Sequence, residues 1–201
     1  MNTINGLPIY AISVAPDEAG MYVISLVEDP AVEVDFLAFD VDKKPLQFAV
    51  QDEEQRMVRG VVMESDKAIY RRDKSGFEYY VTFSKDVIRQ MAQKYLKNGF
   101  QNNVDTQHNF ELEDGVYMQE LFIKDVENGI NPKGFEEVHD GSLFCQFHVE
   151  NDAIWSAIKD GTYKGFSLAG EFAVEEESND EEFEAVMQLI ENLQNKIKNV
   201  K

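Results

Sequence analysis

The sequence predicts a β-rich α+β fold, in which a predominantly antiparallel sheet or barrel is flanked by two helices. Short runs of β-branched and aromatic residues recur along the chain, and Gly, Asp, Asn or Pro stands between most of them. Runs of this kind, bounded by turn residues, are typical of strands. Two other segments show helical spacing of their apolar residues. The expected strands cover residues 8–14, 21–27, 34–40, 56–64, 77–83, 115–125, 141–150 and 165–174.

The two expected helices have recognisable starts and stops. The first begins at the N-cap residue Ser84 and stops at Gly99. The second is shorter, begins near Asn151 or Asp152, and stops at Gly161, directly before the last expected strand. Ser and Asn accept hydrogen bonds from the first free helical N–H groups, and glycine adopts the left-handed conformation that ends a helix. The apolar stripes are Ile88, Met91 and Tyr95 in the first helix and Ile154, Trp155 and Ile158 in the second.

The composition changes after residue 174, which divides the chain into a core, residues 1–174, and a tail, residues 175–201. Residues 175–184 contain seven carboxylates, which suit a solvated linker and a helix N-terminus. The rest of the tail predicts a short, amphipathic, coiled-coil-like helix. It either docks on its own core or self-associates. Its seven-residue repeats are Phe183, Ile190 and Ile197, and Val186, Leu193 and Val200.

The charge of the chain limits the choice of partners. Its 201 residues include 38 acidic and 19 basic side chains, so the net charge is −19. Such a chain repels a phosphate backbone, and we expect no nucleic-acid ligand, although an acidic surface that mimics DNA stays open. The one cysteine, Cys145, has no internal disulfide partner and favours a reducing compartment. We find no signal peptide and no apolar run long enough to span a membrane.

Three histidines are candidates for chemistry, and His108 stands out. It lies in a polar stretch, "NNVDTQHNFELEDG", that leads into an alternating strand. His139 is interpreted as a surface residue in a turn, and His148 as a hydrogen-bonded residue at the edge of a sheet. His108 is either a general base or a structural histidine. Several potential metal ligands surround it, but the zinc-protease pattern H-E-x-x-H is missing, so we predict no metal and no cofactor. These potential ligands are Asp105, His108, Glu111, Glu113 and Asp114.

Ser167 in "TYKGFSLAGEF" is either a packed strand hydroxyl or a nucleophile. The motif G-x-S-x-x-G is not the G-x-S-x-G of a nucleophile elbow, and it follows a helix where the elbow would join a strand to a helix. The α/β-hydrolase fold is therefore excluded. The glycines on both sides would allow a ligand to approach the backbone closely.

Four segments in this order resemble the XkdF-type phage serine proteases. They are "RMVRGVVMESDKAIYRRD", "GFEYYVTFSKDVIRQMAQKYLKNG", "QHNFE" and "VENDAIWSAIKDGTYKGFSLAGEF", and the resemblance covers roughly residues 7–174. That family belongs with the prohead proteases of tailed phages, which share a β-barrel and a Ser/His arrangement with the herpesvirus assemblins. The resemblance implies an assemblin-like β-barrel protease core for residues 1–174. It also implies that Ser167 is the nucleophile and His108 the general base.

The resemblance leaves the third catalytic residue and the oxyanion hole unassigned. Related prohead proteases carry a segment like Glu-x-Ser-Leu-Val after the serine, and its acid would orient the histidine. Here the similar "VISLVEDPAV" at residues 23–32 precedes the histidine, which indicates a circular permutation, and Val23 takes the place of the acid. An arginine after the serine is also expected, but the chain has none beyond Arg89. The remaining candidates to orient His108 are Asp105, His148, Glu28 and Asp29.

The function implied is a capsid-maturation endopeptidase. It would act in the bacterial host cytoplasm, within the phage prohead, and cleave capsid and scaffold proteins, with self-association through the C-terminal helix. A second interpretation keeps the fold without the chemistry, as a non-enzymatic head scaffold or assembly protein. Contact between Ser167 and His108 would favour the enzyme.

Overall fold

The computed structural model describes residues 2–30, 49–52, 55–72 and 75–176 of the chain. These residues form twelve strands, two α-helices and one short 3-10 helix, η2 (Phe100–Asn102). None of the helices described is long and apolar enough to cross a membrane. The strands are β1 (Thr3–Ile4), β2 (Leu7–Ser13), β3 (Gly20–Val27), β4 (Ala49–Asp52), β5 (Met57–Met63), β6 (Ile69–Arg72), β7 (Glu78–Thr82), β8 (Val104–Thr106), β9 (Val116–Ile123), β10 (Leu143–Val149), β11 (Gly165–Glu171) and β12 (Ala173–Glu176).

The strands form three open sheets, and the predicted β-barrel is wrong. One sheet has the order β1-β2-β7-β6 with β12 also paired to β2, the second β4-β5-β10-β9, and the third β11-β3-β8. A barrel needs every strand paired on both sides. In the part of the chain that the structure describes, strands such as β6, β9 and β11 are sheet edges, so no barrel closes. The alternating sequence predicts strands equally well for open and closed sheets, because closure depends on pairing between edges.

Most pairings are antiparallel, as the sequence predicts, but two of those described are parallel. β2 pairs with β7, and β3 pairs with β8. Parallel neighbours need a long crossover between them. The crossover from β3 to β8 contains residues 28–103, with α1 (Lys85–Lys97) near its end. This crossover places the residues just after β8 beside β3, which lies far upstream in the sequence.

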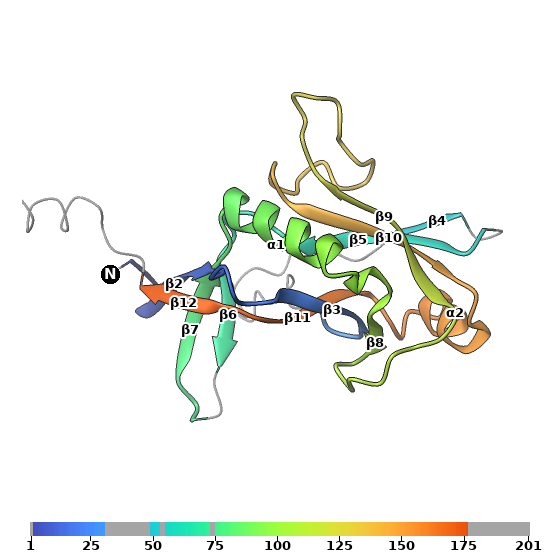
Figure 1. Cartoon of the computed structure of the whole chain (residues 1–201), viewed down its shortest axis with the longest axis horizontal. Coiled ribbons are helices and arrows are strands. Elements are labelled where there is room, and N and C mark those ends of the chain that lie inside the picture. The colour runs from blue at the N-terminus through green and yellow to red at the C-terminus, as the bar shows by residue number, and fades with distance from the viewer. Residues whose placement is uncertain (1, 31–48, 53–54, 73–74, 177–201) are drawn as a thin grey trace, which may run out of the picture.

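Both predicted helices are confirmed. The Ser84 side chain accepts the N–H of Val87 at the start of α1, and the Asn151 side chain accepts two N–H groups at the start of α2 (Asp152–Lys159). α1 packs against β3 and β10, and α2 packs against β10 (Figure 1). The predicted apolar stripes of both helices are buried in the main core. The two helices therefore contribute their apolar faces to the same core as the strands.

A second, small core lies under the loop between β9 and β10. Phe144 of β10 stacks on Phe122 of β9 and meets the edge of Phe135 from the loop.

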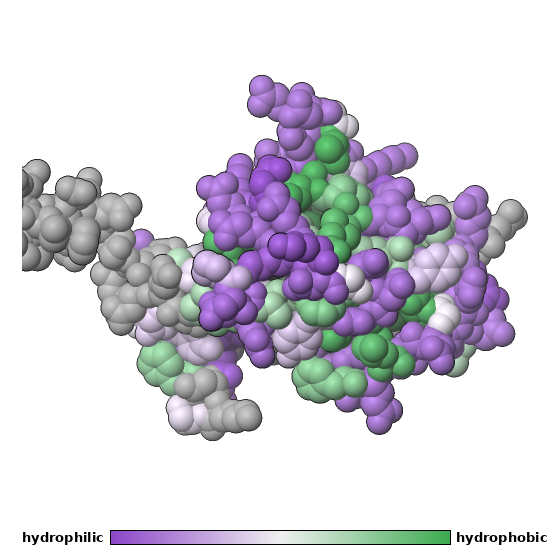
Figure 2. All heavy atoms as spheres, viewed as in Figure 1, coloured by the Kyte–Doolittle hydropathy of each residue, from purple (hydrophilic) through white to green (hydrophobic). Residues whose placement is uncertain are grey.

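Hydrophilic side chains cover most of the face shown in Figure 2, and an apolar strip lies beside α1. Cys145 is buried and free, and burial raises the pKa of its thiol.

Two predicted elements lie outside the described residues. They are the strand at residues 34–40 and the C-terminal helix with its heptad repeats. Four short strands were not predicted, namely β1, β4, β6 and β8, each of four residues or fewer. Of these, β8 contributes most to the candidate site, because it leads directly into His108.

Candidate active site

Three polar residues form a row across the sheet of β11, β3 and β8. Ser167 of β11 is the cross-strand partner of Ser25 on β3, and Ser25 is in turn the partner of Asp105 on β8. Side chains that are directly paired across strands lie on the same face of a sheet. All three are buried: Ser25 and Asp105 are 0% exposed, and Ser167 is 6% exposed. A buried row of two hydroxyls and a carboxyl is unusual in an apolar sheet and calls for polar partners.

His108 lies between the two serines of this row. Its Nε2 atom is 2.9 Å from Ser167 Oγ, and its Nδ1 atom is 2.8 Å from Ser25 Oγ. Both are ordinary hydrogen-bond distances. The structure thus brings together Ser167 and His108, which are 59 positions apart, and adds Ser25. A neutral imidazole has one N–H group, so it donates to one serine and accepts from the other.

The loop that carries His108 has a strained backbone. We call residues 107–115, between β8 and β9, the His108 loop. Gln107, His108 and Phe110 have φ angles of 54°, 56° and 60°, in the left-handed region. For residues other than glycine this conformation costs about 1 to 2 kcal/mol each. Such strain persists where surrounding contacts enforce it, and it concentrates at functional sites.

Several hydrogen bonds hold the His108 loop in place. The backbone N–H of Gln107 donates to the carbonyl of Leu26 on β3, and the Gln107 side chain accepts the N–H of Glu28. The Phe110 N–H donates to Asp105 Oδ2 at 2.9 Å. The loop is therefore tied to β3 and to the buried row, which fixes the position of the imidazole.

Asp105 uses only part of its hydrogen-bonding capacity. One oxygen, Oδ2, accepts the Phe110 N–H, whereas the buried oxygen Oδ1 has no hydrogen-bond partner in the part of the chain that the structure describes. A buried acceptor without a partner costs about 1 to 3 kcal/mol. Asp105 was one of the predicted candidates to orient His108, and the structure places it beside Ser25 with one oxygen unused.

The glycines around Ser167 serve packing within the protein. A Cβ atom on Gly165 would lie 2.5 Å from the ring of Pro30, and one on Gly170 would lie 2.6 Å from the carbonyl oxygen of Gly20. Both approaches are closer than side-chain carbons tolerate. The prediction that these glycines allow a ligand to approach is wrong, because protein atoms occupy the space. They let β11 lie close to the segment around β3.

The other candidate residues lie elsewhere or make other contacts. His139 is exposed, and its ring bonds the carbonyl of Ser65. His148 lies on β10, which is an inner strand and not the predicted edge, and its ring packs against Tyr117. Glu28 and Asp29 are exposed. In the described segments no group of three or more His, Cys, Asp or Glu residues is arranged to hold a metal ion, the cluster around His108 included.

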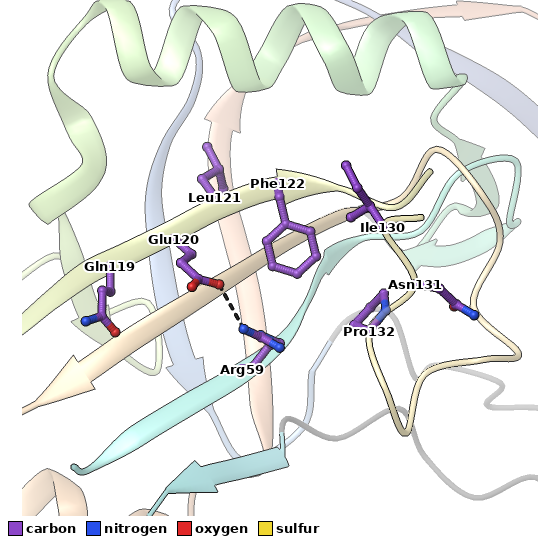
Figure 3. A pocket seen from close by; sticks show the side chains of 8 residues that line it. All are labelled: Arg59, Gln119, Glu120, Leu121, Phe122, Ile130, Asn131 and Pro132. Atoms are coloured by element: carbon purple, nitrogen blue, oxygen red, sulfur yellow. Dashed lines mark hydrogen bonds and ion pairs between the residues drawn. The ribbon is translucent and has the colours of Figure 1, made fainter. Parts of the chain in front are cut away.

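One pocket of the described surface lies away from this site. Figure 3 shows it between β5, β9 and the loop that follows β9. Arg59 and Glu120 form an ion pair across it at 2.8 Å, and the Arg59 guanidinium lies over the Phe122 ring. Neither serine of the row nor His108 lines it. Arg59 Nε is buried without a hydrogen-bond partner among the described residues, but no serine and no histidine lines this pocket. We therefore place the site at Ser167, Ser25 and His108.

Ser25 is the site residue that sequence reasoning missed. The resemblance of "VISLVEDPAV" to related proteases places the expected acid at Val23, whereas the side chain that bonds His108 is Ser25. Val23 and Ser25 are two residues apart on one strand and so lie on the same face. The available signal was this period of two, together with the fact that a hydroxyl can also accept a hydrogen bond from histidine.

A strand serine hydrogen-bonded to an imidazole, on a framework of open β-sheets, defines a candidate serine hydrolase. Comparison with protein families narrows this class. The chain belongs to the family described as "Putative phage serine protease XkdF", whose model matches residues 46–176, and the predicted membership is confirmed. The match includes His108 and Ser167 and begins after Ser25. No curated protein and no solved structure matches the chain.

Proposed function

We propose that this protein is a serine endopeptidase of the phage prohead, which cleaves capsid or scaffold protein segments during head maturation. Ser167 is the nucleophile and His108 the general base. The observation that carries this proposal is the 2.9 Å contact between Ser167 Oγ and His108 Nε2. Family membership supports the reaction class.

The geometry suits acyl transfer. As Ser167 Oγ bonds to the carbonyl carbon of the scissile peptide, its proton passes to His108 Nε2. The tetrahedral adduct collapses, the C–N bond breaks, and His108 returns that proton to the leaving amine. Water then attacks the acyl-enzyme and gives a proton to His108. Release of the carboxylic acid product restores the proton to Ser167 Oγ, so atoms and charges balance.

The surroundings of Ser167 support an extended peptide substrate. β11 lies at an edge of its three-stranded sheet, where a peptide could pair as an added strand. Two apolar side chains of the His108 loop, Phe110 and Leu112, are 64% and 56% exposed. They offer contacts for apolar substrate residues. The net charge of −19 favours partners with basic surfaces.

The test is co-expression with the capsid protein of the same phage, followed by mass spectrometry of the capsid fragments. We expect Ser167→Ala and His108→Ala to lower cleavage by at least about 10³-fold while the thermal unfolding temperature stays near that of the wild type. His139→Ala and Ser156→Ala are the matched controls, because both residues are exposed and lie outside the row. Both controls should cleave normally, and EDTA should leave cleavage intact.

Unchanged cleavage in both Ser167→Ala and His108→Ala would overturn the proposal. Absence of cleavage by the wild type, together with no labelling of Ser167 by a fluorophosphonate, would favour the non-enzymatic assembly protein instead.

A further inference from the structure

We propose that Ser25 is the residue that positions His108, and that the buried Asp105 carboxyl completes this arrangement by orienting the Ser25 hydroxyl. The resulting order is Asp105, Ser25, His108, Ser167. This inference rests on the proposed protease function, and it names the third member that the sequence left open.

The tautomer of His108 decides which serine is activated. With the proton on Nδ1, the ring donates to Ser25 Oγ at 2.8 Å, and its Nε2 lone pair accepts the Ser167 hydroxyl. With the proton on Nε2, the ring donates to Ser167 and cannot take its proton. General-base catalysis therefore requires the first arrangement, in which Ser25 is an acceptor.

Asp105 explains why Ser25 accepts from His108. When Ser25 Oγ accepts from Nδ1, its own O–H must point elsewhere. Asp105 is the in-register neighbour of Ser25 on β8 and is 0% exposed, and among the described residues its Oδ1 has no hydrogen-bond partner, Ser25 Oγ included. Without a direct hydrogen bond to Ser25, the carboxyl acts on the hydroxyl through space, and its negative end favours an O–H that points toward β8 and away from the imidazole. Asp105 also holds the His108 loop through the Phe110 N–H, so it acts on both position and tautomer.

Exposure and topology separate the roles of the two serines. β3 is the middle strand of its sheet, paired with β11 on one side and β8 on the other, and Ser25 is 0% exposed. Ser167 is on the edge strand and retains 6% exposure. A substrate carbonyl can approach only the second, so Ser25 is a positioning residue.

The first test reads the tautomer without any substrate. In ¹⁵N NMR spectra of the histidine-labelled full chain at neutral pH, we expect His108 to carry its proton on Nδ1. Ser25→Ala and Asp105→Asn should shift the population toward Nε2–H, because the acceptor is lost or is faced by an amide donor. Ser25→Thr keeps the hydroxyl and should restore the wild-type tautomer. A wild-type His108 protonated on Nε2 would overturn the inference.

The second test measures the rate at which a fluorophosphonate labels Ser167. We expect about a 10²- to 10⁴-fold loss in Ser25→Ala and Asp105→Asn, with rescue in Ser25→Thr. Full-rate labelling in both deficient variants, or labelling of Ser25 itself, would overturn the inference. If Ser25→Ala fails to fold, the wild-type tautomer and Asp105→Asn still decide. Failure of Ser167 to react in any variant, with the Nδ1–H tautomer intact, would count against the protease function and leave the positioning role standing.

Discussion

The two loops at the ends of β9 differ in backbone strain and in the hydrogen bonding of the buried polar groups beside them. The His108 loop precedes the strand, and the Lys124 loop, residues 124–142, follows it. The left-handed positions of the Lys124 loop are all glycines: Gly129, Gly134 and Gly141. The His108 loop places Gln107, His108 and Phe110 in that conformation. Glycine adopts it without strain, whereas other residues do so at a cost.

The buried polar groups show the same contrast. Lys124 is 2% exposed, and its ammonium donates to the carbonyls of Phe135, Glu136 and Val138 at 2.8–3.0 Å. An ammonium has three N–H groups, so its capacity is fully used. Asp105, on β8 just before the His108 loop, leaves one oxygen without a partner among the described residues. The Lys124 loop thus combines an unstrained backbone with a fully hydrogen-bonded ammonium, whereas the segment around His108 combines left-handed residues with an unused carboxyl oxygen.

The largest expected effect on stability comes from removing the Lys124 ammonium. Lys124→Met keeps the apolar stem but leaves three carbonyls without their donor, so the free energy of unfolding should fall by about 3 kcal/mol. Urea denaturation measures this change. The rate of Ser167 labelling per folded molecule should stay at the wild-type value, because the loop lies outside the row.

Lys133→Met is the matched control, since Lys133 is an exposed lysine of the same loop. It should change stability by less than about 0.5 kcal/mol. If Lys124→Met lowered labelling of Ser167 without lowering stability, the assignment of the Lys124 loop to structure would be wrong.

A pair of glycine substitutions tests the difference in strain. Gly134→Ala introduces a Cβ that meets nothing within 4 Å, so its cost reflects the φ of +88° alone. We expect a loss of about 1 kcal/mol. Phe110→Gly removes a left-handed phenylalanine and should increase stability by about 0.5 to 1 kcal/mol. Urea denaturation of both variants shows whether the free energy of unfolding falls in the first and rises in the second.

Leu112→Gly controls for the flexibility that glycine adds to the unfolded chain. Leu112 is an exposed apolar residue of the His108 loop, but its φ is not in the left-handed region. This substitution should lower stability slightly. Equal effects of Phe110→Gly and Leu112→Gly would show that the His108 loop stores no strain at Phe110.

Local signals in the sequence predict the helices and strands, but they do not predict which strands pair with one another. Ser84 and Asn151 mark helix starts because a cap bonds N–H groups two or three residues away. The barrel prediction failed because closure depends on which edges pair, and residues far apart decide that. His108 and Ser167 were selected through family resemblance, since neither has a distinctive spacing.

Ser25 shows the same limit within the site. It lies 83 positions from His108, and only the register of β3 between β11 and β8 brings it there. A one-residue shift of that register would turn the side chain to the other face of the sheet. The fold and the site were therefore predictable to the extent that short-range bonding determines them.

The smallest expected effect concerns acid and the outer turn of the Lys124 loop. The side chain and backbone N–H groups of Asn128 bond the Asp125 carboxylate and hold its pKa below the ordinary value of 3.8. A lowered pKa in the folded state stabilises the turn above the ordinary value, and this contribution is lost as the pH falls through the folded-state pKa. The protection of the Asn128 amide against hydrogen exchange, relative to an unfolded chain at the same pH and followed by NMR, should decrease in that acid range.

The Gly141 N–H, which bonds the carbonyl of Lys124, is the internal control, and its exchange should respond less. Asp125→Asn removes the titrating group, so exchange at Asn128 should then lose this step in its pH dependence. If both amides lost protection at the same pH, the Asp125 turn and the hydrogen bonds of Lys124 would open together. In that case the stability of this loop would depend on a surface carboxylate as well as on the buried ammonium, and its contrast with the His108 loop would be weaker than the static contacts indicate.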